Sequence, residues 1–227
     1  MEFDGTFKKV SDNEVTVTIN DQQIIDNLRQ FEISMEKPEI TLRIVDKRNL
    51  SPRQRRKTYA MLRDMSNWTG YELEDYKQLM KGMFYEAFGT EPFSLANTDM
   101  TTARMFISFL IEVALEQGIP MNQPLRERTD DLDVYMLQSL RHRSCAICGQ
   151  HADIHHIDAI GMGNDRTTAD HRGRKMIALC RIHHQLAGDM GWQTFSELFH
   201  VVGVVPSSEM IKSLGLMTQK RMNEIDE

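Results

Sequence analysis

Residues 145–184 read CAICGQHADIHHIDAIGMGNDRTTADHRGRKMIALCRIHH. The segment opens with Cys145-x-x-Cys148 and closes with Cys180-x-x-His183, so each pair of candidate ligands is separated by two residues. This spacing lets both side chains of a pair reach one tetrahedral ion while the backbone turns. The two pairs together predict a closed site of three cysteines and one histidine, a set suited to structural Zn²⁺.

The composition around this segment supports a metal site. Residues 141–188 hold all three cysteines and seven of the eight histidines of the chain. Three cysteines cannot pair completely as disulfides, whereas His183 completes a metal-binding set without leaving a free thiol. The alternative is that the cysteines are reduced core residues with a chance spacing.

Two further histidines lie between the cysteine pairs, in Asp153-Ile154-His155-His156-Ile157, which alternates as a β-strand does. Neighbouring strand residues face opposite sides, so His155 and His156 are expected to have different roles. If the following segment is helical, His184 points about 100° away from the zinc ligand His183, towards a second site. A strand with two histidines, a connection and a helix with a histidine suggest a one-metal phosphodiesterase.

Residues 141 to about 200 resemble an HNH endonuclease domain of the ββα-metal type, in the form braced by two zinc knuckles that phage-encoded HNH nucleases contain. The matching text is Cys145-x-x-Cys148, Ile154-His155-His156-Ile157 and Leu179-Cys180-x-x-His183-His184. The resemblance implies that His156 is the general base that activates water. It also implies that His155 and His184 bind the catalytic divalent ion. The implied ligands of the structural zinc are Cys145, Cys148, Cys180 and His183.

The expected catalytic ion is Mg²⁺ or Mn²⁺, because a hard ion can polarise a phosphate and stabilise the leaving oxygen. Imidazole ligands would also admit Ni²⁺ or Zn²⁺. A neutral imidazole, with a pKa of about 6.5, can take a proton from water at cellular pH. Arg172, Arg174 and Lys175 would contact flanking phosphates, or each would simply be a solvated charge.

The sequence departs from the family pattern at two positions. The family commonly has another histidine about one helical turn after His184, where this chain has Gly188; the adjacent Asp189 could supply an oxygen ligand, or water could fill the position. The central Asn of the family, which fixes the general base, has no obvious counterpart. Asp170 or His171 stands at about the right distance before the helix.

The pattern of apolar residues predicts an α+β fold with a small N-terminal sheet. Val15-Val17-Ile19 and Ile40-Leu42-Ile44 alternate as half-buried strands do. Ser51-Pro52 predicts a helix start. Further helices are expected at 72–88, 101–117, 131–140, 192–199 and 208–223. The expected domains are an N-terminal α+β DNA-binding or assembly domain (1–120), a linker or helix (121–140) and a zinc-braced nuclease domain with C-terminal helices (141–227).

The first half is loosely similar to phage NinB-like (Orf) recombination proteins, in residues 51–59, in 64–71 with Trp68-Thr-Gly70, and in 93–104. The similarity implies binding to single-stranded or branched DNA. A basic cluster at the expected helix start would suit a phosphate backbone, although such a cluster is often only a solvated face. Its residues are Arg53, Arg55, Arg56 and Lys57.

The net charge of the whole chain, -6, at first argues against a polyanionic partner. Residues 141–188, however, hold seven basic and four acidic residues, so the charge of the expected nuclease segment is positive. No apolar stretch is long enough for a membrane span, and residues 1–4 are acidic where a signal peptide would be basic. We therefore expect a cytoplasmic protein, in the bacterial host if it is phage-encoded.

The sequence predicts a metal-dependent endonuclease that hydrolyses DNA phosphodiester bonds in phage DNA recombination or processing. DNA is the expected partner, and phage recombination proteins are further candidate partners. The sequence is also compatible with an oligomer. A non-catalytic DNA-binding recombination mediator with a degenerate HNH fold is the alternative, motivated by Gly188 and the missing Asn. A zinc-ribbon adaptor for proteins would leave His155, His156 and His184 unexplained.

Overall fold

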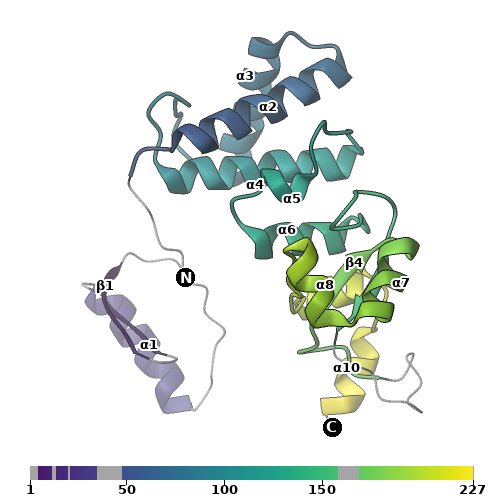
Figure 1. Ribbon diagram of the computed structural model, residues 1–227. Helices are drawn as coiled ribbons and strands as arrows, with labels where there is room; N and C mark the ends of the chain where they lie inside the picture. The colour runs from purple at the N-terminus through teal and green to yellow at the C-terminus, as the bar shows by residue number, and fades with distance from the viewer. Residues whose placement is uncertain (1–4, 12–13, 20, 35–47, 158–168, 227) are drawn as a thin grey trace. The chain divides into compact units, whose positions relative to one another are not determined.

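The computed structural model describes residues 5–11, 14–19, 21–34, 48–157 and 169–226 (Figure 1). In these ranges the chain is mainly helical, with two small antiparallel sheets of two strands each, which confirms the mixed α and β composition. The chain divides into two compact units, Met1–Ile44 and Val45–Glu227. The predicted division at residues 121–140 stays a prediction, and the strand expected at Ile40-Leu42-Ile44 lies outside the described residues.

The described residues of the first unit form a β-hairpin and one helix. Strand β1 (Gly5–Ser11) pairs antiparallel with β2 (Glu14–Ile19), and Val17 lies opposite Phe7. Helix α1 (Gln22–Ser34) contacts β2. The strand expected from the alternation of Val15, Val17 and Ile19 is therefore confirmed.

The second unit begins with five helices, α2 (Pro52–Thr69), α3 (Leu73–Phe88), α4 (Met100–Gln117), α5 (Leu125–Arg128) and α6 (Leu132–Arg141). Helix α2 starts where Ser51-Pro52 predicted. The Ser51 hydroxyl accepts a hydrogen bond from the Gln54 backbone N–H at 3.2 Å, and the Ser51 N–H donates to the Gln54 side chain at 2.9 Å. This reciprocal capping box satisfies two backbone donors that a helix start otherwise leaves unpaired.

One continuous hydrophobic core joins these helices to the cysteine-rich segment. The Phe84 ring of α3 packs edge-on against the Phe106 ring of α4, with 5.3 Å between the ring centroids. The same buried cluster includes Leu140 of α6 and extends to Cys145 and Phe195. Because α6 contacts both α4 and β4, the helices form the platform on which the cysteine-rich segment is built.

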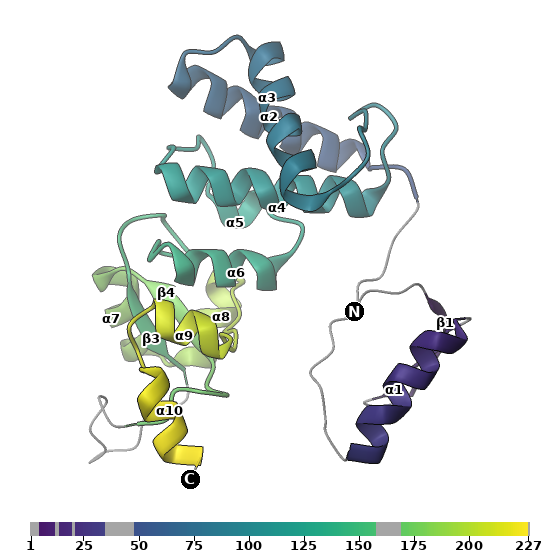
Figure 2. The ribbon, with the colours of Figure 1, turned by 180° about the vertical axis from the view of Figure 1, so that it is seen from behind.

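The remaining elements of the second unit are β3 (Asp153–His156), β4 (Met176–Leu179), α7 (Arg181–Met190), α8 (Trp192–Phe199), α9 (Ser208–Ser213) and α10 (Gln219–Asp226). Strands β3 and β4 are antiparallel and lie side by side in the view from behind (Figure 2). Helix α7 follows β4 directly and contacts both strands. Two antiparallel strands followed by a helix are the order that the family resemblance implies.

One of the two predictions for the C-terminal helices is confirmed, and the other is wrong. Helix α8 has the expected bounds of 192–199. The helical stretch expected at 208–223 is instead two helices, because Gly215 has a positive φ of 71° and the chain turns there. No helix in the described ranges combines the length and apolar character needed to cross a bilayer.

Tyr135 provides a test of the contact between α6 and the first cysteine pair. Its buried hydroxyl donates to the Ala146 carbonyl at 3.0 Å, and burial raises the pKa of Tyr135 to about 12. Tyr135→Phe leaves this carbonyl without its donor and is expected to lower the free energy of unfolding by about 1–2 kcal/mol in a denaturant titration. Tyr71→Phe is the control, since Tyr71 is exposed. Equal stability of the two variants would contradict the expectation.

Candidate metal centre and histidine pairs

The four predicted zinc ligands converge in the structure. Cys145 and Cys148 lie on the turn after α6, Cys180 precedes the first residue of α7, and His183 lies in the first turn of that helix. In the part of the chain that the structure describes, they are the only group of three or more His, Cys, Asp or Glu residues whose ligand atoms all lie within 4.8 Å of one another. The group could therefore hold a metal ion.

Three distances within the group are close to those expected around a tetrahedral ion. Cys180 Sγ and Cys145 Sγ lie 3.2 and 3.5 Å from His183 Nδ1, and Cys148 Sγ lies 3.7 Å from Cys180 Sγ. Around a tetrahedral zinc, with Zn–S and Zn–N bonds of about 2.3 and 2.0–2.1 Å, the ligand atoms stand about 3.5–3.8 Å apart. Three sulfur atoms and one imidazole nitrogen form a donor set that zinc prefers.

The backbone holds the first cysteine pair in position. The Cys145 N–H donates to the Gln150 carbonyl at 2.7 Å, and the Gly149 N–H donates to the Cys145 carbonyl at 2.8 Å. Gly149 has a φ of 73°, which favours glycine and permits the tight turn. The Ala146 N–H donates to the Ala178 carbonyl of β4 at 3.0 Å. The turn is thus attached to the strand that leads into the second pair of ligands.

The surroundings of His183 favour its neutral form. Burial lowers the pKa of His183, and the charge of Arg126 lowers it further. The His183 ring packs edge-on against Phe199, with 5.4 Å between centroids. A neutral imidazole is the form that binds a metal. Burial also raises the pKa of Cys148 to about 12, a cost to the thiolate that a bound cation would offset.

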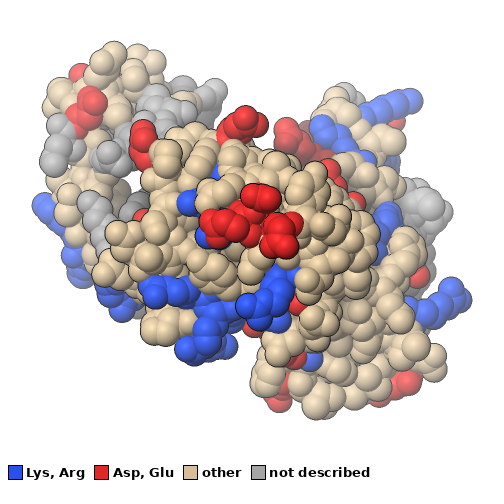
Figure 3. Space-filling model, turned by 90° about the horizontal axis from the view of Figure 1, so that it is seen from above, with Lys and Arg blue, Asp and Glu red and all other residues tan. Residues whose placement is uncertain are grey.

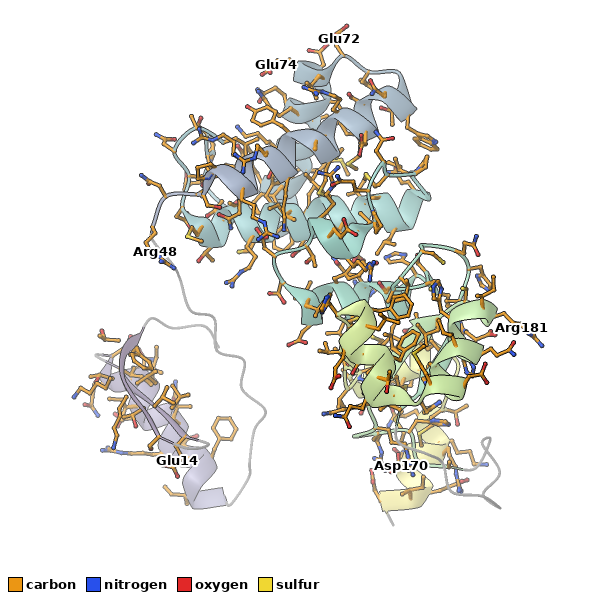
Figure 4. The ribbon with its side chains drawn as sticks, viewed as in Figure 1. Glu14, Arg48, Glu72, Glu74, Asp170 and Arg181 are labelled. Atoms are coloured by element: carbon orange, nitrogen blue, oxygen red, sulfur yellow. The ribbon has the colours of Figure 1, made fainter. Side chains whose placement is uncertain are left out.

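Four other histidines of the segment form two pairs, one for each histidine of β3. The rings of His155 and His184 are perpendicular, with 4.5 Å between centroids and an angle of 88° between planes. A cavity of 370 Å³ beside this pair is lined by Asp153, Ile154, Arg181, His184 and Gln185. The Arg181 side chain extends outward from the start of α7 (Figure 4). The structure thus brings together the two expected ligands of the catalytic ion.

The second pair joins His156 to His171. His156 Nε2 lies 2.8 Å from His171 Nδ1, so one nitrogen carries the shared proton and the other accepts it. His171 is buried, and its backbone N–H donates to Met217 Sδ at 3.2 Å. The sequence alone is compatible with either Asp170 or His171 as the residue that fixes the base. The structure places His171, and not the Asp170 side chain, against His156.

Asp170 instead contacts two of the predicted phosphate-binding residues. Its carboxylate accepts hydrogen bonds from Arg172, which holds the pKa of Asp170 below its usual range. Arg172 also pairs with Asp226 of α10 at 2.8 Å, and Arg174 Nε donates to the Asp170 carbonyl at 2.6 Å. Figure 4 shows Asp170 beside α10. The charge of Arg172 is therefore already shared between two carboxylates.

The remaining predicted site residues lie in different surroundings. Gly188 and Asp189 are exposed on α7, and Asp189 does not join His155 and His184 in a metal-binding group within the described residues. On α2, Arg53 and Arg56 are exposed, and Arg55 donates to the Ala96 carbonyl. Lys57 differs from them, because it is buried and pairs with Asp130 at 2.7 Å. Lys175 is exposed.

The metal centre can be tested by metal analysis of the purified full chain. We expect one zinc ion per chain in the parent. Cys148→Ser should lower the zinc content well below one and unfold residues 145–190 at lower temperature, since structural zinc contributes folding free energy directly. His151→Asn, which changes an exposed histidine outside the group, should retain the metal. Folded parent protein without zinc would contradict the expectation.

Comparison with known proteins agrees with this geometry. The family model described as "Putative HNHc nuclease" matches residues 19–216, which is most of the chain. No curated protein and no solved structure matches the chain significantly. Because the family model covers both the helices of the second unit and the metal-ligand segment, the match is not limited to the short histidine motif. The chain belongs to this family of HNH nucleases.

Proposed function

We propose that the protein is a metal-dependent HNH endonuclease that hydrolyses phosphodiester bonds of DNA. The observation that carries the proposal is the division of the β3 histidines into two pairs, His155 with His184 and His156 with His171. Membership of a nuclease family supports the reaction class. The two pairs supply the two groups that phosphodiester hydrolysis needs, a site for a cation at the phosphate and a base for the water.

His155 and His184 would hold the divalent ion, with Mg²⁺ or Mn²⁺ as the first choice. When bound, this ion supplies positive charge that polarises the phosphate and stabilises the leaving 3′ oxygen. Two imidazoles leave other coordination positions to water, phosphate oxygens or a carboxylate such as Asp189. The three-cysteine, one-histidine group would bind structural zinc and keep β4 and α7 in place.

His156 would act as the general base, and His171 would position it. If His156 Nε2 carries the shared proton and donates to His171 Nδ1, then the lone pair of His156 is on Nδ1. His156 Nδ1 can then take a proton from the attacking water while the water oxygen forms a bond to phosphorus. The bond between phosphorus and the 3′ oxygen breaks, and the leaving oxygen takes a proton from solvent. His171 thereby performs the role expected of the family Asn.

The proposed substrate interactions extend to basic residues outside the histidine pairs. Arg174 and Lys175 stand directly before β4, and Arg174 contacts the Asp170 carbonyl next to the Asp170–Arg172 ion pair. A role in phage DNA recombination or processing is part of the proposal and rests on the loose resemblance of the first half to NinB-like proteins. A cytoplasmic location, phage partners and an oligomer belong to the same proposal.

Cleavage of DNA tests the role of His156. The parent with Mg²⁺, Mn²⁺ or Ni²⁺ should nick or cut at least one substrate of a panel of linear, single-stranded and branched DNA. His156→Ala should lower the cleavage rate by at least about 100-fold, because general-base catalysis typically contributes that much. The zinc content should stay at the parent level. His151→Ala is the matched control, since His151 is exposed and outside both pairs. A His156→Ala variant that cuts as fast as the parent would disprove the assignment.

The same assay separates an enzyme from the alternative, a DNA-binding recombination mediator. The metal-binding group found among the described residues does not include His155 and His184, and Gly188 stands where the family commonly has a further histidine; these features favour the alternative. Tight DNA binding by the parent, with no cleavage of any substrate with any of the three metals, would establish the mediator.

His171 is a positioning residue, and its variants test that role. His171→Ala should slow cleavage by about 10-fold or more, since His156 loses the group that fixes its tautomer. His171→Asn should restore most of the rate, because an amide oxygen can accept the proton of His156 Nε2. If both variants lose the same activity, His171 acts only by filling space.

A further inference from the structure

A cavity of 520 Å³ lies between α2 and the segment that contains α5, and we call it the α2–α5 pocket. Nine residues line it, of which five are basic and one, Glu127, is acidic. The basic residues are Arg53, Arg56, Lys57, Arg126 and Arg128. Asp130 and Asp64, which are outside this lining, pair with Lys57 and Arg128, and the positive charge that remains attracts anions and raises their local concentration.

The pocket is held in shape by bonds between its two walls. Lys57 Nζ of α2 donates to the Thr129 carbonyl at 2.9 Å and pairs with the Asp130 carboxylate. Seven residues further along α2, the Asp64 carboxylate accepts a hydrogen bond from the Asn122 N–H at 3.2 Å. These contacts attach both ends of the 122–130 segment to α2. Lys57 therefore joins the two walls of the pocket, and its charge is already paired with Asp130.

The inner wall contains two arginines whose hydrogen-bonding capacity is incompletely used. The Nε atoms of Arg126 and Arg128 are buried and have no hydrogen-bond partner among the described residues. Arg128 is 8% exposed, and its ion pair with Asp64 is long, at 3.8 Å. A guanidinium has five donors in a rigid fork that matches phosphate oxygens. Because the Nε atoms themselves are closed to solvent, an anion in the pocket would interact with the charge of these two guanidinium groups and not with their Nε atoms.

The outer wall presents Arg53 and Arg56, which are exposed and stand three residues apart on one face of α2. Neither forms an ion pair with another described residue. Figure 3, which looks down on α2 and α3, shows Lys and Arg side chains gathered along one side of an acidic group. The pocket thus combines buried guanidinium groups with exposed ones, as a site for a phosphate group of a large, solvent-exposed ligand requires.

We propose that the α2–α5 pocket binds a backbone phosphate of the nucleic acid, at a site separate from the hydrolytic histidines. The identity of this ligand rests on the proposed function. The pocket is also connected to the metal centre. Arg126 donates to the Phe199 carbonyl at 2.7 Å, and the Phe199 ring packs against His183. A DNA strand that is bound in the pocket therefore has a fixed position relative to the nuclease site.

Binding to labelled DNA tests the proposal without any cleavage. The zinc-loaded full chain, with no added divalent metal, is titrated into a fluorescent 30-base-pair duplex at several KCl concentrations, and anisotropy is recorded. Arg56→Gln should weaken binding by about 5- to 10-fold and lower the slope of log K against log salt by about 1, as expected for one lost phosphate contact. Arg63→Gln is the matched control. It removes the same charge from an exposed position two turns further along α2, outside the pocket.

A second variant addresses the buried wall. Arg128→Gln should weaken binding in the same way, and a thermal unfolding measurement should first confirm that it is folded. If Arg128→Gln does not fold, the comparison of Arg56→Gln with Arg63→Gln decides alone. Equal losses in those two variants would overturn the pocket, because they would show a long-range effect of charge.

The source of the phosphate is tested by calorimetric titration with inorganic phosphate and with a mononucleotide. Tight binding of either one, lost in Arg56→Gln while duplex binding is unchanged, would overturn the proposal of a nucleic-acid site.

Failure of the pocket proposal and failure of the nuclease proposal are distinguishable. A parent that does not cleave but shows Arg56-dependent binding refutes only hydrolysis. A parent that cleaves while Arg56→Gln binds DNA as the parent does refutes only the pocket.

Discussion

The convergence of Cys145, Cys148, Cys180 and His183 on one point is the constraint on which the second half of the structure depends. The elements around it are short, since β3 and β4 have four residues each and α7 has ten. A two-stranded sheet of that length is marginally stable by itself. Bonds from four side chains to one ion would hold the turn after α6 and the start of α7 together, in addition to the hydrophobic core that β4 enters.

This constraint also orients the histidines. His184 follows His183 directly, so the orientation of α7 that brings His183 to the cysteines directs His184 to His155. His156 faces the other side of β3, towards His171, because neighbouring strand residues alternate. The Cys145–His183 group and the two faces of β3 thus direct His155 and His156 into two separate histidine pairs. The helical platform supports the arrangement through the Tyr135 contact with Ala146 and through β4.

The basic side chains are divided between positions that are paired inside the fold and positions that face solvent. The chain has a net charge of -6, yet several of its basic side chains are gathered where α2 meets the 122–130 segment. Some cations are used inside the fold, as Lys57 is with Asp130, and Arg172 is shared by Asp170 and Asp226. Others, including Arg53 and Arg56, face solvent. Neither the net charge nor membership of a basic cluster therefore shows whether a basic residue is used inside the fold. The partners of its side chain show this.

The sequence by itself determined the features that depend on local spacing. The two ligand pairs, the strand of His155 and His156, and the start of α2 at Ser51-Pro52 each follow from the geometry of a few consecutive residues. Only the tertiary structure decided between Asp170 and His171 as the partner of His156, because both precede β4 at a similar distance along the chain. It also decided that Lys57 is buried and that Arg126 and Arg128 face a pocket with Arg56. Such contacts join residues about 15 to 75 positions apart, and their formation depends on how whole elements pack, which no local pattern records.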